Sequence, residues 1–158
     1  MIKQCFAFIS LSLFTWACND NVLFQSEKEI ANSIWTYQDS INIAFNIADT
    51  SKLYNMYLTM EHRDTFATQN IYLQLHTKFP NGKRLSRIRS FDLYNIKGEP
   101  TGKCSGHQCE VKFALQENAY FNQVGEHVLT IVQNTRQDAL GNIQKVGLRI
   151  EKTDKIKK

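Results

Sequence analysis

The sequence is poor in the two residues that most often interrupt regular structure, with Gly 7 and Pro 2 among 158 residues. Collagen-like and low-complexity chains need many of both, so those classes are excluded. Hydrophobic residues make up 42% and charged residues 22%, a composition that does not suit a disordered protein. A chain of this length buries about 68–70% of its unfolded surface, so we expect one domain with its own core.

Motifs that mark the common enzyme classes are also missing. The sequence has no glycine-rich phosphate loop, no G-x-S-x-G nucleophile elbow and no H-E-x-x-H zinc motif. Its four histidines stand singly along the chain. We therefore predict a protein that is not an enzyme and has no catalytic residues, no metal site and no cofactor.

The N-terminal stretch, MIKQCFAFISLSLFTWAC, has the layout of a secretory signal. Lys3 precedes the charge-free run 5–17, which is too short for a membrane-spanning helix of about 20 residues and fits a signal-peptide core. The run ends at Ala17-Cys18, which resembles a bacterial lipoprotein cleavage site. We predict residues 1–17 as a signal peptide and Cys18 as the acylated residue that anchors the protein to a membrane. A plain secretory signal cut elsewhere and a buried N-terminal segment are the alternatives.

The other two cysteines of the mature chain, Cys104 and Cys109, lie in the segment KCSGHQCE. Export to an oxidising compartment favours a disulfide between them, and the four intervening residues, with Gly106, suit a tight hairpin. Free thiols are one alternative. Metal binding by both cysteines and His107 is another, although these three ligands are one short of a structural zinc site.

Polar residues fill 18–33, which we predict to be a tether, and from there apolar and polar residues alternate. Alternation is typical of strands with one buried face, and it recurs at 41–47, 54–60, 71–79, 111–115, 128–132 and 146–150. Pro80-Asn81-Gly82 favours a hairpin turn. We predict an all-β domain over 34–152, followed by a basic tail at 153–158. Its expected architecture is a two-layer antiparallel β-sandwich, immunoglobulin-like or jelly-roll-like, of roughly seven or eight strands, with an up-and-down barrel as the alternative.

Four side chains are candidates for an interaction surface. Arg87 and Arg89 lie two residues apart and so share one strand face, while Tyr57 and Tyr72 fall opposite the apolar sets of their strands. Exposed tyrosines stack on sugars or anchor protein partners, and paired arginines attract an anionic glycan or an acidic protein. The alternatives are cross-strand pairing for the tyrosines and protection of an edge strand for the arginines.

Several segments together resemble the gliding-motility lipoprotein GldH family of Bacteroidota. They are the lipoprotein-like start, YNMYLTM, NIYLQLHTKFPNGK, GEHVLTIVQNTR and the closing VGLRIEK, so the resemblance runs from about Cys18 to Lys152. It implies an envelope lipoprotein that works with other envelope proteins of a motility machinery tied to type IX secretion. We expect the lipid anchor on the periplasmic side of the outer or inner membrane, with exposure at the cell surface as the alternative. No active-site residue carries over, and Cys18 alone has a role in the family, as the acylated residue.

Two functions follow from these observations. The first is that of a non-catalytic structural or interaction component of the motility machinery. The alternative is a glycan- or ligand-binding envelope lipoprotein, motivated by the outward tyrosines and the Arg87/Arg89 face. Nucleic acid is not expected as a partner, because the protein is exported and its net charge of +4 falls to only +3 once Lys3 leaves with the signal.

Overall fold

The computed structural model describes residues 21–157, so the predicted signal peptide and Cys18 lie outside the described residues. Within 21–157 the chain forms eleven strands and one 3-10 turn, η1 (Ala31–Ser33). In that part of the chain, no helix is long and apolar enough to cross a membrane.

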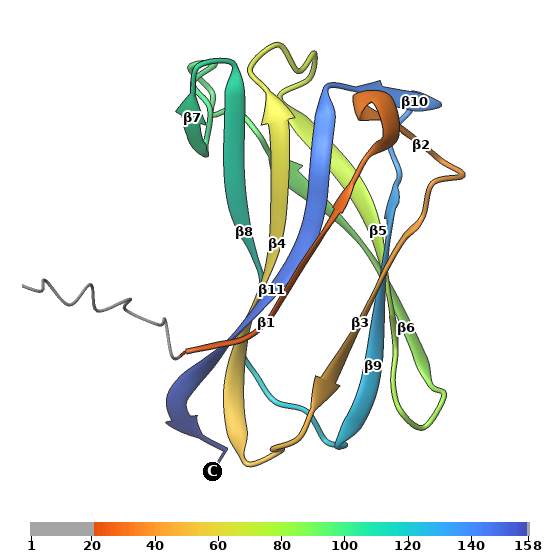
Figure 1. The fold of residues 1–158 in the computed structure, drawn as a ribbon, viewed down its shortest axis with the longest axis vertical. Coiled ribbons are helices and arrows are strands. Elements are labelled where there is room, and N and C mark those ends of the chain that lie inside the picture. Colours follow the sequence, from red (N-terminus) through yellow and green to blue (C-terminus); the bar gives the residue numbers. More distant parts are fainter. Residues whose placement is uncertain (1–20, 158) are drawn as a thin grey trace, which may run out of the picture.

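The strands form two antiparallel sheets packed face to face (Figure 1). The five-stranded sheet has the order β1-β11-β4-β8-β7, with bounds β1 Val22–Glu29, β11 Ile143–Ile156, β4 Lys52–Arg63, β8 Gln108–Ala119 and β7 Lys103–Ser105. The four-stranded sheet has the order β3-β9-β5-β6, with bounds β3 Ile41–Ile47, β9 Gly125–Gln133, β5 Asn70–Lys78 and β6 Arg84–Asp92. A small pair, β2 (Ile34–Thr36) and β10 (Ala139–Gly141), lies at the upper end. The predicted two-layer antiparallel β-sandwich is confirmed.

The core lies between the two sheets, where the inward side chains of alternating strands meet. In β3 burial alternates at every residue, because successive side chains of a strand point to opposite faces. β4 contributes Leu58 and β11 contributes Leu148 from the facing sheet, both fully buried. Trp35 of β2 closes the upper end, and its indole Nε1 donates to the carbonyl oxygen of Asp39 at 2.7 Å.

The structure corrects the predicted strand number and boundaries. There are eleven strands over 21–157 rather than seven or eight, because β2, β7 and β10 have three residues each and are too short to show a period. Residues 22–29, predicted as part of a tether, form β1 and pair with β11 along the edge of the sheet. β11 extends to Ile156, so most of the predicted basic tail is strand. Edge strands with exposed polar side chains lack the apolar alternation that marked the others.

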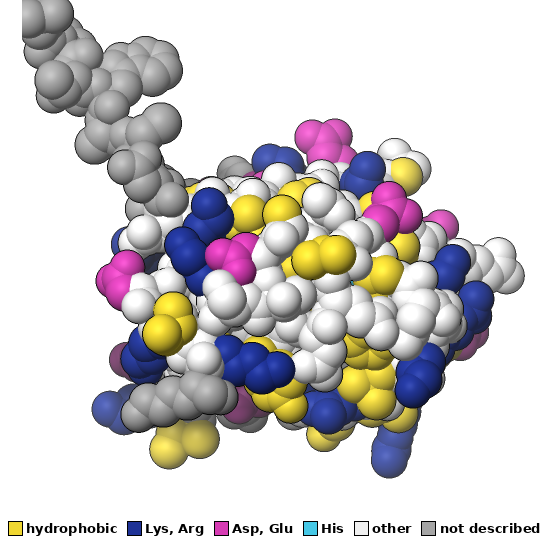
Figure 2. Space-filling view, turned by 90° about the horizontal axis from the view of Figure 1, so that it is seen from below, with side chains coloured by type: hydrophobic (Ala, Val, Ile, Leu, Met, Phe, Trp, Pro, Cys, Tyr) yellow, Lys and Arg dark blue, Asp and Glu magenta, His cyan; other side chains and the backbone are white. Residues whose placement is uncertain are grey.

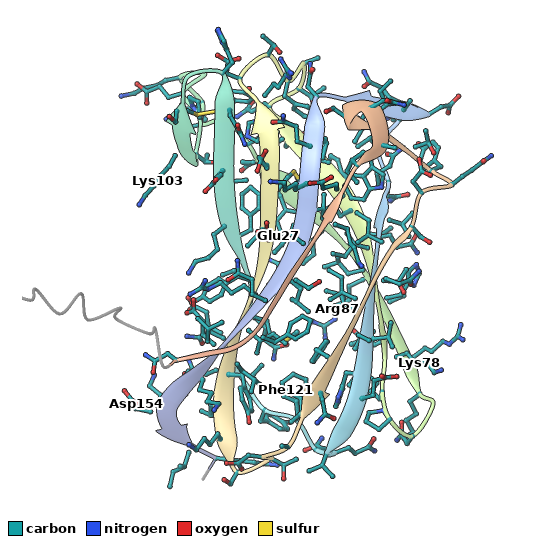
Figure 3. All side chains as sticks on the ribbon, viewed as in Figure 1. Glu27, Lys78, Arg87, Lys103, Phe121 and Asp154 are labelled. Atoms are coloured by element: carbon teal, nitrogen blue, oxygen red, sulfur yellow. A yellow bond between two sulfur atoms is a disulfide. The ribbon has the colours of Figure 1, made fainter. Side chains whose placement is uncertain are left out.

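Aromatic rings surround the buried His127, and one of them belongs to Phe121, which Figure 3 labels in the lower half of the sandwich. The imidazole stacks on Phe45, with ring centroids 5.4 Å apart, and meets Phe121 edge-on at 4.9 Å. Burial lowers the pKa of His127, because apolar neighbours solvate imidazolium poorly, while a hydrogen bond at 3.1 Å between Nδ1 and the carbonyl oxygen of Gly125 partly opposes the shift. The folded state therefore favours the neutral ring.

We expect the free energy of unfolding to fall as the pH drops below the ordinary histidine pKa of 6.5. Above that pH His127 is neutral in both states; below it the unfolded chain binds a proton that the folded chain resists, until the lowered folded pKa is reached. Urea titrations between about pH 8 and pH 5 should show this loss in the wild type. His127→Phe should flatten the dependence, whereas His76→Gln on the outer surface should keep it. An unchanged slope in His127→Phe would assign the effect to other groups.

Candidate interaction surface

The four side chains predicted as an interaction surface lie in three separate places. Tyr57 is on the outer face of the five-stranded sheet, where Nζ of Lys112 lies 4.0 Å from the ring centroid. Tyr72 is on the outer face of the four-stranded sheet and is 46% exposed. Arg87 and Arg89 are on β6 and face the gap between the sheets. The structure therefore does not bring the four together.

Arg87 and Arg89 close an open side of the sandwich. Among the described residues, β6 pairs only with β5, and most of β8 pairs only with β4, so both strands have a free edge there. Nη1 of Arg89 spans the gap between these edges and donates to the carbonyl oxygen of Leu115 on β8 at 2.6 Å. Arg87, which Figure 3 labels, lines a hollow of about 210 Å³ together with Arg89. This arrangement supports edge protection, since inward-pointing cations on an edge strand disfavour the addition of a further strand.

Cys104 and Cys109 face each other across the β7–β8 hairpin and form a disulfide. Gly106 in the turn has a φ of 59°, a conformation that suits glycine. His107 turns to a different partner, with Nδ1 3.0 Å from Oδ2 of Asp64. Within residues 21–157, no group of three or more His, Cys, Asp or Glu side chains could hold a metal ion. The bridge closes a loop of only a few residues, so its effect is local rigidity at the end of the five-stranded sheet.

Paired charges cover the outer face of the five-stranded sheet. Nζ of Lys145 lies 3.1 Å from Oε2 of Glu61, and this hydrogen bond and charge raise the pKa of Lys145. Burial would raise the pKa of Glu151, but hydrogen bonds from Arg149 at 2.6 Å and Lys112 at 3.3 Å hold it below the ordinary value. Each of these five charged groups therefore forms an ion pair with another group of the same face.

A hollow of about 610 Å³ lies over this charged face. It extends from Glu27 on β1 to Lys103 on β7, which Figure 3 labels on the two sides of the sheet. Acidic, basic and hydroxyl side chains all contribute to its lining, so it offers no single sign of charge to a ligand.

The middle of the outer face of the four-stranded sheet, in contrast, carries almost no formal charge. Tyr72 lies opposite Ser90, and Gln74 lies between Ile88 and Val132 in the register. The neutral face, as we call it, consists of Asn42, Ala44, Tyr72, Gln74, His76, Ser86, Ile88, Ser90, Val128, Thr130 and Val132.

Hydrogen bonds across the strands hold the polar members of the neutral face in place. Oγ1 of Thr130 donates to Oδ1 of Asn42 at 2.6 Å. At its upper margin Tyr72 lines a further hollow of about 530 Å³ together with Asn134 and Arg136. The result is a surface of amide, hydroxyl and apolar groups whose only large exposed aliphatic side chain, among the described residues of this face, is Ile88 at 58%.

The sequence did not predict the neutral face, because charged and aromatic residues were taken as the signs of an interaction surface. This face is distinguished by its lack of charge. The alternation at 41–47, 71–79 and 128–132 was used to assign inward positions. The outward positions of the same three segments are almost all uncharged, and this was the signal that could have found the face. These uncharged positions indicate a single surface only when the three strands are known to be neighbours in one sheet.

Comparison with known proteins identifies a family and two relatives that this chain is similar to. The family model described as GldH lipoprotein matches residues 22–150. A gliding motility lipoprotein GldH homolog from Christiangramia forsetii is 26% identical over 156 residues, covering 94% of this chain and 95% of the relative. The gliding motility lipoprotein GldH of Flavobacterium johnsoniae is 22% identical over 160 residues, covering 97% and 99%.

A solved family 16 carbohydrate-binding module aligns with 78% of this chain and 72% of its own, at 15% identity and a TM-score of 0.21, which is too low to indicate a shared fold. The family match, by contrast, spans most of the chain and agrees with the resemblance read from the sequence. The chain therefore belongs to the GldH lipoprotein family.

Proposed function

We propose that this lipoprotein is a non-catalytic interaction component of the gliding-motility machinery of the cell envelope, in the setting of type IX secretion. Acyl chains on Cys18 would hold it on the periplasmic side of a membrane. The names of both relatives support the motility role. The charge-free run that ends at Ala17-Cys18 supports the anchor.

The neutral face is the observation that supports docking of this domain onto another protein. Interface centres are depleted of charge and enriched in aromatic side chains relative to the rest of a protein surface. Ile88 and Tyr72 are exposed on an uncharged background, whereas the opposite sheet covers itself with paired charges. A charge brought onto the neutral face would be buried without a counter-ion. The partner is therefore an envelope protein whose contacting surface is also poor in charge.

Ile88→Asp places a carboxylate in the middle of the neutral face and should weaken docking at least about tenfold, as expected for the loss of a buried anchor. Ile88 is exposed, so we expect the variant to fold normally. The measurements are co-purification of identified motility proteins from host membranes and the spreading of colonies on agar. Ala114→Asp is the matched control, because Ala114 is also exposed on a strand with a free edge, but on the charged sheet.

Other occupants of the neutral face give different results. If Ile88→Asp leaves co-purification and spreading intact while Tyr72→Ala abolishes binding on a glycan array, the face is a glycan site and the protein-docking proposal is wrong. If Ile88→Asp changes only the sedimentation of the purified protein, the occupant is a second copy of this chain, which also contradicts the proposal.

A further inference from the structure

Exposed apolar side chains and lysines gather at the lower end of the sandwich. Tyr120, Val124 and Ile156 are 54%, 59% and 67% exposed. Figure 2 looks onto this end and shows hydrophobic side chains next to Lys and Arg. We call the following set the basal patch: Lys52, Tyr120, Val124, Lys155, Ile156 and Lys157, all exposed.

Contacts between segments make the basal patch an ordered surface rather than a loose tail. The backbone N–H of Lys157 donates to the carbonyl oxygen of Ser51 at 2.8 Å, which ties the chain end to the β3–β4 connection. Its Nζ lies 4.5 Å from the ring centroid of Tyr120 and 3.2 Å from Oδ1 of Asn122 on the β8–β9 connection. Three separate segments therefore present the patch together.

The charge of the basal patch is positive. The six residues of the patch include three lysines and no acidic side chain, and the acidic residues within three positions of them in the chain are Asp49, Glu117, Glu126 and Asp154. Asp49 is occupied within its own turn, since it accepts hydrogen bonds from the hydroxyl of Ser51 at 2.6 Å and from its N–H at 2.8 Å, which lower the pKa of the carboxyl. Lysines beside exposed aromatic and aliphatic side chains are the combination found on proteins that rest on anionic lipid.

The start of β1 keeps the proposed anchor close to this end. β1 begins at Val22, four residues after Cys18, and a fully extended chain spans at most about 3.6 Å per residue, so the anchor is within about 14 Å of Val22. Val22 pairs with Glu151 of β11. From Glu151 to Ile156 the strand continues toward the basal patch for about 17 Å. The anchor therefore cannot hold the domain far from its membrane.

We propose that the basal patch rests on the anionic lipid surface to which the chain is anchored. The inference depends on the proposed acylation of Cys18 and adds an orientation to it. The negative potential of such a surface attracts the three lysines, and Tyr120, Val124 and Ile156 lie among the headgroups. The strands then stand away from the membrane, and the neutral face is presented sideways to a neighbouring envelope protein.

The test uses the full lipidated protein in vesicles that contain phosphatidylglycerol and a spin-labelled lipid. A fluorophore is attached at Val124→Cys in the basal patch or at Ile96→Cys in the β6–β7 connection. Ile96 is the matched control, being 95% exposed, and its loop lies by the opposite end of β4, where the hydroxyl of Tyr94 donates to the carbonyl oxygen of Asp64 at 2.9 Å. We expect the lipid to quench the label at 124 and not the label at 96.

Two changes should abolish the quenching at 124 while the protein still floats with the vesicles. One replaces phosphatidylglycerol by phosphatidylcholine around the wild-type chain, so folding is not affected. The other is the triple variant Lys52→Glu, Lys155→Glu and Lys157→Glu, with Lys97→Glu as control. Equal quenching at both positions, or none at 124 in anionic vesicles, overturns the inference. Failure of the proposed anchor gives a different result, since the protein would then not float at all.

Discussion

Gly147→Ala is expected to destabilise the domain by about 3 kcal/mol, at the upper end of the usual cost of overpacking. Gly147 lies in β11, between β1 and β4 of the five-stranded sheet, and is paired with Glu27 of β1 and Thr59 of β4. A Cβ here would lie 2.5 Å from the carbonyl oxygen of Ser26, 2.6 Å from Cγ of Glu27 and 2.6 Å from Oγ1 of Thr59. The two side chains can move, but the Ser26 oxygen belongs to the backbone of β1. Relief therefore requires β1 to shift away from β11.

Gly141→Ala is the matched control, because among the described residues, apart from Gly141 and its two chain neighbours, no heavy atom lies within 4 Å of a Cβ built there. A surface change of this kind should alter stability by less than about 0.5 kcal/mol. Urea unfolding followed by circular dichroism measures both variants, and hydrogen exchange of the β1 amides shows whether that strand detaches first. Adding Thr59→Ala to Gly147→Ala should restore only part of the loss, since the Ser26 oxygen remains. Equal midpoints for the two glycine variants would contradict the argument.

The same glycine shows where prediction from the sequence stops. Val146, Leu148 and Ile150 gave the period of two that predicted this strand, and they are buried as expected. Gly147 sits between them at an outward position, and its necessity comes from β1, which is distant in the sequence and lacks an apolar period. The sequence predicted the sandwich because alternation is local. It did not predict β1 or the close approach over Gly147, because the pairing of distant strands leaves no local pattern.

Surface residues show the same limit. Alternation correctly placed Tyr57 and Tyr72 on outer faces, yet it could not say that these faces belong to different sheets. Spacing placed Arg87 and Arg89 on one side of a strand, but only the register with β5 shows that this side faces the gap between the sheets. A one-residue change in register would reverse that orientation. Local alternation shows whether a side chain points toward the core or toward solvent. It does not show which residues are its neighbours across the sheet.

Cys18→Ser is expected to move the protein from the membrane fraction to the soluble fraction, with a loss of membrane partitioning of at least about a hundredfold. Each buried methylene of an acyl chain contributes about 0.8 kcal/mol, so two or three chains would give stable anchoring. The three lysines of the basal patch contribute about 1 kcal/mol each and are screened by salt. The measurement is fractionation of the host membranes followed by washing at high salt.

The double variant Cys104→Ser and Cys109→Ser controls for the loss of cysteine itself and should stay with the membrane, since the hairpin disulfide has no part in anchoring. Cys18→Ser that remains bound after the salt wash would mean that another element anchors the chain. The lysine triple variant should behave in the opposite way, keeping its place on the membrane while losing its orientation. The proposed anchor and the proposed patch would therefore be separable, because the anchor would act through covalently attached hydrocarbon that salt does not affect and the patch through surface charge that salt screens.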